Sequence, residues 1–246
     1  MSSTYKQGLF TLGVPPETFD LPHRRLDIAI ILLVRRVVAR AFQLLRERGF
    51  NLANCTEDQI TAAIRGIIEN DLRQSGAVPG FNKRVFESVT RQQQVENFDL
   101  SKLSKAPDLC FKLRNYEDES RALSTHDALF VECKPVDSDH STGGDYCDLG
   151  IQRFVDGDYA WAMQDAIMIG YVRNKRSIAT HLMPVIQKSP RKERLKIVEL
   201  PRALVDGNIT GLDALHLSRH ARGFPWIYGK GAATDVFVYH SWYPCD

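Results

Sequence analysis

The chain has few of the features that mark secreted or membrane-spanning proteins. Its 246 residues include five cysteines, an odd number without paired spacing, which predicts reduced thiols in a cytoplasmic protein. The longest apolar run, Ile28 to Val34, is too short to span a bilayer and leads directly into Arg35-Arg36, so no membrane partner is expected. Residues 1–13 lack a basic region followed by an apolar stretch, so no signal peptide is expected.

Several chemistries also lack their sequence patterns. The pair Gly143-Gly144 has no Walker lysine after it and belongs to no dinucleotide-binding pattern. The spacing of Cys133, His140 and Cys147 matches no zinc site. None of the five cysteines stands at a strained turn or helix start, where a Cys-His hydrolase needs its nucleophile. Nucleotide binding, zinc binding and thiol-based hydrolysis are therefore not expected.

What is present is an ordinary balance of residue types. With 43% hydrophobic and 25% charged residues, the chain has the composition of a globular protein with one large domain. A polar lead-in over residues 1–22 precedes Arg24 to Arg48, which predicts one long helix ended by Gly49. We therefore expect an N-terminal helical extension over residues 1–54 and a main domain over residues 55–246.

The main domain shows alternating helix and strand patterns. Thr56 to Gln59 is a capping-box string, and it opens a helix that closes near Gly76. The apolar stripe of this helix is Ile60, Ile64, Ile67, Ile68 and Leu72. A second helix is predicted over residues 160–172, and polar loops are predicted over residues 115–127 and 137–148. Strands are predicted over residues 84–91, 108–114, 128–134 and 178–187, and a C-terminal hairpin over residues 215–222 and 236–242.

Two short strings near the middle of the chain stand out. Pro107-Asp108 is the only Pro-Asp pair, and Glu132 is the only acidic residue followed two places later by a lysine, Lys134. Each string lies at one end of an apolar run that predicts a strand, over residues 108–114 and 128–134. If these strands are antiparallel neighbours, the start of the first lies beside the end of the second. The two carboxylates would then be brought together.

The alternation of side chains divides the second string between two faces of its strand. Glu132 and Lys134 share one face, whereas Cys133 points to the opposite one, so its thiol is expected in the core. The predicted site comprises Asp108, Glu132, Lys134 and the backbone carbonyl of Cys133. Pro135 cannot donate to a ladder and is expected to end the strand, whose unbroken apolar start predicts burial on both faces.

These residue types suit metal-assisted hydrolysis of a phosphodiester. Two close carboxylates repel each other, so a cation that neutralises them is favoured, and hard oxygen ligands favour Mg²⁺ or Mn²⁺ over zinc. Such an ion polarises a phosphodiester oxygen and lowers the pKa of bound water, while Lys134 would orient the attacking water. The leading hypothesis is a metal-dependent nuclease. The alternative is a strand that ends at the surface with a solvated Glu132 and Lys134.

The strings Pro107-Asp108 and Val131-Glu132-Cys133-Lys134 resemble the motif of the PD-(D/E)xK nuclease superfamily, the fold of many restriction endonucleases. The resemblance covers residues 55–242 and implies a restriction-endonuclease-like α/β core, with a central mixed β-sheet flanked by helices. Most members hydrolyse DNA with Mg²⁺, which implies Asp108 and Glu132 as metal ligands and Lys134 as the catalytic lysine. An acidic residue from the preceding helix often completes the site, and Glu57 and Glu69 are both candidates.

The net charge of +2 hides an asymmetry along the chain. Residues 108–165 carry thirteen acidic against five basic residues, whereas residues 173–202 carry nine basic against two acidic residues. A basic band beside a metal site is what phosphate-backbone binding requires, although a solvated helix face accounts for such a run nearly as well. The residues expected to contact nucleic acid are Gln152, Arg153, Arg191, Lys192 and Arg194.

The resemblance leaves two functions open. The first is a Mg²⁺-dependent endonuclease acting on DNA, with a role in restriction or anti-phage defence. The second is a nuclease-like domain that no longer cuts and serves as a DNA-binding or assembly module. The chain shows no separate recognition domain, so targeting is expected from a partner subunit or from a homodimer. The helix over Arg24 to Arg48, apolar on much of its circumference, is a candidate docking surface.

Overall fold

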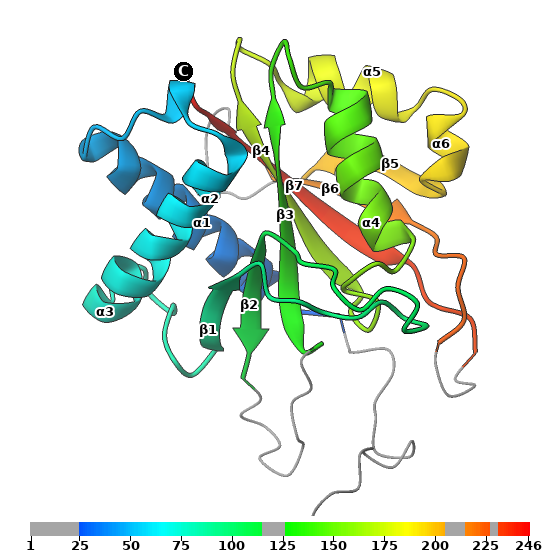
Figure 1. Ribbon diagram of the computed structural model, residues 1–246, viewed down its shortest axis with the longest axis horizontal. Coiled ribbons are helices and arrows are strands. Elements are labelled where there is room, and N and C mark those ends of the chain that lie inside the picture. The colour runs from blue at the N-terminus through cyan, green and yellow to red at the C-terminus, as the bar shows by residue number, and fades with distance from the viewer. Residues whose placement is uncertain (1–24, 115–125, 205–214, 227–230) are drawn as a thin grey trace, which may run out of the picture.

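The centre of the protein is a seven-stranded mixed β-sheet with helices on both faces (Figure 1). The computed structural model describes residues 25–114, 126–204, 215–226 and 231–246. The strand order is β1-β2-β3-β4-β7-β6-β5, with β3–β4 and β4–β7 parallel and the other pairs antiparallel. The strands are β1 (Phe86–Arg91), β2 (Leu109–Leu113), β3 (Ala128–Val136), β4 (Asp165–Val172), β5 (Ile197–Ala203), β6 (His216–His220) and β7 (Val236–Pro244). The predicted α/β class with a central mixed sheet is confirmed.

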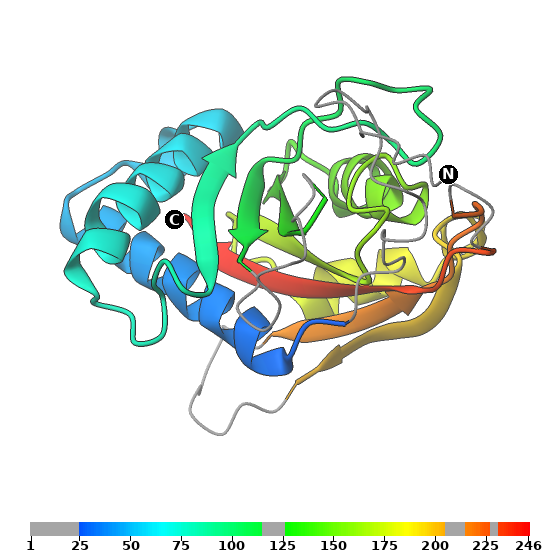
Figure 2. The same cartoon turned by 90° about the horizontal axis from the view of Figure 1, so that it is seen from below.

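The helices divide between the two faces of this sheet, as the view from below shows (Figure 2). One face carries α1 (Ile28–Glu47), the 3₁₀ turn η2 (Leu52–Asn54), α2 (Glu57–Ile67), the π-helical η3 (Ile68–Leu72) and α3 (Arg73–Ser75). The other face carries π-helical η4 (Thr142–Ile151), α4 (Gln152–Val155), π-helical η5 (Ile178–Leu182), α5 (Met183–Ile186) and α6 (Arg191–Arg194). The polar lead-in predicted for residues 1–22 and most of the loop predicted for residues 115–127 lie outside the described residues.

The long first helix is part of the core. Asp27 caps α1 by accepting a hydrogen bond from the backbone N–H of Ala29, and the predicted helix is confirmed with its end at Glu47. Its apolar side chains from Ile31 to Leu45 are buried in one cluster with α2 and the sheet. Packing inside the chain therefore accounts for the apolar circumference that we expected to dock a partner.

The second helix starts and ends as its sequence predicts. Thr56 and Gln59 form the expected capping box, and the predicted apolar stripe is buried. The helix continues through η3 and α3 and stops at Gly76, whose φ of +66° is readily available only to glycine. The N-cap at Thr56 places Glu57 in the first turn of α2, at the end of the helix that lies nearest to β3.

Strand β3 is buried along its whole length, as its apolar start predicts. It differs from the prediction at its end, because Pro135 lies inside the strand and pairs with Tyr171 of β4. The N–H of Cys133 points away from β4, toward Asp108, and successive N–H groups alternate in direction along a strand. Pro135 therefore turns its nitrogen to the side that β2 no longer covers, where a missing donor breaks no ladder.

Two segments after β3 exchange their predicted structures. A helix is predicted over residues 160–172, but Asp165–Val172 forms strand β4, buried throughout. A short apolar run buried on both faces lacks the alternation that distinguishes a strand from a buried helix. The strand predicted over residues 178–187 is instead helical, as η5 and α5. Pro184 stands where η5 passes into the first turn of α5.

Three further differences concern local structure. The polar segment predicted as a loop over residues 137–148 contains the start of η4, capped by Ser141. Strand β5, which lies within the basic band, is not predicted from the sequence. A bulge in β1 between Phe86 and Ser88 places Phe86 and Val89 together in the core, which strict alternation along a strand would not do. The C-terminal hairpin is confirmed as the antiparallel pair β6–β7.

All five cysteines are free thiols. Within the described part of the chain, no helix combines the length and the apolar character needed to cross a bilayer.

Candidate functional site

The candidate site forms where β2 stops covering β3. Strand β2 begins at Leu109, opposite Val131, so the edge of β3 beyond Val131 has no strand beside it on that side. Asp108, one residue before β2, fills part of this gap, because its Oδ2 accepts a 2.7 Å hydrogen bond from the backbone N–H of Cys133. The predicted antiparallel pairing of the two strands is confirmed, and it brings Asp108 beside the Glu132-Cys133-Lys134 string.

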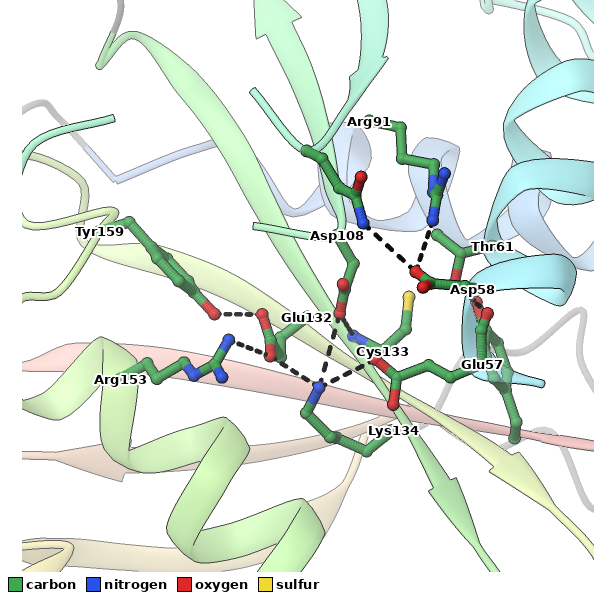
Figure 3. Close-up of polar contacts among 12 residues, drawn as sticks. Glu57, Asp58, Thr61, Arg91, Asp108, Glu132, Cys133, Lys134, Arg153 and Tyr159 are labelled. Carbon is green, nitrogen blue, oxygen red and sulfur yellow. Dashed lines mark hydrogen bonds and ion pairs between the residues drawn. The ribbon is translucent and has the colours of Figure 1, made fainter. Parts of the chain in front are cut away.

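The ammonium group of Lys134 is the centre of the site (Figure 3). Its Nζ lies 2.9 Å from Oε1 of Glu132, 3.0 Å from Oε1 of Glu57 and 3.8 Å from Oδ2 of Asp108. These carboxylates come from β3, from the first turn of α2 and from the residue before β2. Three acidic side chains that are distant in sequence thus surround one buried lysine.

Burial sets the electrostatics of this group. It raises the pKa of Glu132 to about 7, with a further contribution from the nearby charge of Asp108. It also raises the pKa values of Asp108 and Glu57 above their ordinary range, although Lys134 acts in the opposite direction. For Lys134 itself, burial lowers the pKa, but the carboxylates outweigh this effect and raise it above its usual value. Lys134 therefore stays protonated, and it compensates the surrounding acids only in part.

Glu132 has two further partners, one at each oxygen of its carboxylate. Nη1 of Arg153, from α4, donates to Oε1 at 2.8 Å, and the hydroxyl of Tyr159 donates to Oε2. The sequence predicts Arg153 as a phosphate contact, whereas the structure places it against Glu132. Tyr159 is not predicted at all, because no local pattern links a tyrosine after α4 to a strand 27 residues earlier.

The structure distinguishes the two candidate helix acids. Glu57 lies at the site through its contact with Lys134. Glu69 lies on η3, where its Oε1 accepts hydrogen bonds from Arg73 and from the backbone N–H of Val89. Glu57 is therefore the acidic residue of this helix that joins the site, and Glu69 connects the helix to β1.

The other residues expected to contact nucleic acid lie outside this cluster. The side-chain amide of Gln152 donates to Asp156 and to the backbone carbonyl of Arg194. Arg191 and Arg194 both form ion pairs with Asp148, at 2.9 and 2.5 Å. Lys192 is exposed on α6. Two of the predicted basic contacts thus share one acidic residue of η4.

An open pocket of about 650 Å³ adjoins the site. Its wall includes the first turn of α2, the end of β3 and the residue after β4. The lining residues that matter for the chemistry are Thr56, Glu57, Lys134, Asp137, Arg153 and Arg173. Lys134 and Glu57 therefore face a space that is open to solvent and large enough to admit a phosphate group.

The acids expected to bind a metal lie close together, but they are not arranged as a metal site. Over residues 25–114, 126–204, 215–226 and 231–246, no three His, Cys, Asp or Glu side chains are arranged to hold a metal ion. The carboxylates converge on Lys134 instead. Their chemistry nevertheless fits a hard divalent cation, because they are oxygen donors whose pKa values are raised mainly by burial, and a bound cation would favour their ionised form. At Cys133, where a carbonyl ligand is predicted, the group observed in contact is the N–H.

The fold and the site together define an α/β protein with a mixed sheet and a lysine enclosed by carboxylates at an uncovered strand edge. No protein-family model matches this chain, and no curated protein or solved structure is significantly similar to it.

Proposed function

We propose that the protein is a metal-dependent endonuclease that hydrolyses phosphodiester bonds in DNA. The observation that carries this proposal is the convergence of Glu57, Asp108 and Glu132 on the ammonium group of Lys134, beside an open pocket. A purely structural ion pair needs one acid for one base. Three acidic side chains against two bases, Lys134 and Arg153, leave one negative charge uncompensated when all are ionised, which a divalent cation would balance.

Mg²⁺ or Mn²⁺ would be held by Asp108 and Glu132, with Glu57 as the third acid. When bound, such an ion would supply Lewis-acid polarisation of the phosphodiester and a more acidic water. The remaining roles belong to the chain itself. Lys134, protonated across the neutral range, would offset the negative charge on the phosphate.

The proton released by the attacking water needs an acceptor near neutral pH. Glu132 is suited to this role because its carboxylate lies beside Lys134 and the bound ion would keep it ionised. Arg153 and Tyr159 would hold its two oxygens in a fixed orientation. The proposal includes a cytoplasmic role in restriction or anti-phage defence, in which a partner subunit or a second copy of the chain supplies the targeting.

Cleavage of supercoiled plasmid DNA in Mg²⁺ or Mn²⁺ tests the proposal directly. Wild-type protein is expected to nick or linearise the plasmid, and Glu132→Gln is expected to lower the rate by about a hundredfold or more, the usual scale for loss of a general base. Glu87→Gln, which changes an exposed acid on β1, is the matched control and should keep the wild-type rate. Equal rates for Glu132→Gln and wild type would remove Glu132 from the mechanism.

A second candidate is a nuclease-like module that no longer cuts and serves in DNA binding or assembly. The observation that favours it is the saturation of Glu132, whose two oxygens are already engaged by Lys134, Arg153 and Tyr159. A cation would have to displace one of these partners. Under this alternative, purified protein binds DNA but leaves it intact in both Mg²⁺ and Mn²⁺.

A further inference from the structure

Arg173 directly follows β4 and joins three segments of chain in the pocket wall. Its Nη1 donates to Oδ2 of Asp137 at 2.9 Å. Its Nη2 donates to the backbone carbonyls of Leu52 and Cys55, at 3.0 and 2.7 Å. Asp137 directly follows β3, and Cys55 directly precedes Thr56, the N-cap of α2. One guanidinium group thus ties the ends of two central strands to the segment that begins α2.

Asp137 is itself held firmly in place. Its Oδ1 accepts hydrogen bonds from the backbone N–H groups of Asp139 and His140, and Nδ1 of His140 lies 2.7 Å from the same oxygen. Burial acts against ionisation, but the hydrogen bonds from His140 and Arg173 outweigh it and hold the pKa of Asp137 below its ordinary value. The carboxylate therefore remains charged at neutral pH, and Arg173 has a fixed anionic anchor.

A second contact from β4 supports the same turn of α2. Tyr171 lies two residues before Arg173, and its hydroxyl is 2.8 Å from Oγ1 of Thr61. The Thr61 hydroxyl in turn donates to the backbone carbonyl of Glu57 at 2.8 Å. Glu57 therefore lies between two contacts to β4, one through Thr61 and one through Cys55.

We propose that Arg173 is a positioning residue that holds the carboxylate of Glu57 beside Lys134. This inference rests on the proposed function, in which Glu57 is the third acid of the nuclease site. The apolar stripe of α2 fixes the body of the helix, whereas the start of its first turn is fixed by the hydrogen bonds of Arg173. Lysine cannot replace this residue, because its single ammonium lacks the planar fork that reaches a carboxylate and two carbonyls at once.

Steady-state cleavage kinetics test this role. Arg173→Lys and Asp137→Asn are each expected to lower kcat by about tenfold or more while KM changes by less than about twofold, because the displaced acid acts in the chemical step. In a Glu57→Gln background, the same Arg173→Lys change should have less than about a twofold effect. A full additional loss in that background would overturn the proposal, since Arg173 would then act through another group. Arg48→Lys, at an exposed ion pair with Asp71, is the matched control.

A second measurement does not depend on nuclease activity. Cys55 is partly exposed, whereas the other four cysteines are buried, so a thiol reagent added to native protein reports on the segment that Arg173 holds. Arg173→Lys and Asp137→Asn should each speed this reaction by about threefold or more, and Arg48→Lys should not. Urea unfolding checks that each variant folds. If Arg173→Lys does not fold, the thiol reaction of Asp137→Asn decides the test.

The two measurements distinguish the positioning role of Arg173 from the proposed nuclease activity. If the Cys55 thiol reacts at the wild-type rate in both Arg173→Lys and Asp137→Asn, the role of Arg173 is overturned, whether or not the protein cuts DNA. A faster thiol reaction together with wild-type protein that never cuts DNA would support the positioning of this turn and overturn the nuclease proposal.

Discussion

The backbone N–H of Cys133 donates a 2.7 Å hydrogen bond to Oδ2 of Asp108, so a side-chain carboxylate takes the place of the next partner that β2 would have offered β3. The position of Asp108 relative to Glu132 and Lys134 therefore follows from backbone register, not from the ion pairs alone. The thiol of the same cysteine lies in the core on the opposite face, as predicted. A backbone contact of this kind survives substitution of the Cys133 side chain.

Replacing Lys134 with Met is expected to abolish cleavage and to destabilise the fold. The change leaves Glu132 and Glu57, which lie 2.9 and 3.0 Å from Nζ, without their buried cation. We expect a loss of about 3 kcal/mol in the free energy of unfolding at about pH 8, and a smaller loss at about pH 5, where Glu132 is largely protonated. Urea unfolding at both pH values measures this, with exposed Lys188→Met as the control. Equal losses at the two pH values would contradict the assignment.

Glu132 is expected to make the protein less stable as pH rises toward neutrality. Its pKa is 4.5 when exposed and is raised to about 7 in the folded state, mainly by burial. Between these values the folded state binds more protons than the unfolded state, so the free energy of unfolding falls with rising pH. Glu57 and Asp108, whose pKa values are also raised, act in the same sense.

The Glu132→Gln variant tests this dependence, because it removes one titrating group while keeping the shape of the side chain. Urea denaturation between about pH 4.5 and 7.5 should give a flatter curve of unfolding free energy against pH than the wild type gives. A curve as steep as that of the wild type would show that Glu132 titrates with an ordinary pKa.

Tyr159→Phe is expected to move the pH profile of cleavage. The Tyr159 hydroxyl donates to Glu132 and lowers the pKa of that carboxyl, in opposition to burial. Without this hydrogen bond, Glu132 should ionise at higher pH, so the acid limb of the rate profile should shift upward by about one pH unit. Tyr239→Phe, which removes a hydroxyl near Asp165, is the control and should leave the limb in place. A uniform loss of rate at every pH would indicate a packing effect instead.

Cleavage is expected to require Mg²⁺ or Mn²⁺ and to fail in Ca²⁺. Calcium accepts the same oxygen ligands but is larger and more loosely coordinated, so it should permit DNA binding and support little chemistry. Binding should also stabilise the fold, by about 2.7 kcal/mol at a hundred times the dissociation constant. Asp108→Asn should lose most of this stabilisation, which thermal unfolding with and without the ion would measure. Full activity in EDTA would exclude a metal mechanism at this site.

The basic residues of α6 are expected to contribute little to DNA binding. Arg191 and Arg194 already pair with Asp148, whereas Lys192, exposed on the same helix, is not engaged by that acid. Reversing all three charges should therefore reduce the slope of log affinity against log salt by about 0.9, the value for one phosphate contact. Fluorescence anisotropy with labelled DNA at several salt concentrations measures the slope. A reduction of the slope close to the value for three phosphate contacts would show that both arginines leave Asp148 and contact the DNA.

Local sequence patterns determined much of the frame of this protein. The capping box at Thr56, the stop at Gly76 and the burial of β3 follow from rules that act within a few residues. Strand alternation also determined that Glu132 and Lys134 share a face while Cys133 points into the core. These features need no knowledge of distant segments.

Tertiary structure alone decided which side chains meet at the site. Glu57 and Glu69 are both acids of one helical segment, and only the packing of its first turn against β4 brings Glu57 to Lys134. Arg153 reaches Glu132 from α4, and Tyr159 reaches it from the turn after α4, for which no periodicity exists. Residues 160–172 carry an apolar run that suits a buried helix or strand equally, and pairing with β3 and β7 selects the strand. Contacts between distant segments depend on how the whole sheet is ordered, which no local window of sequence contains.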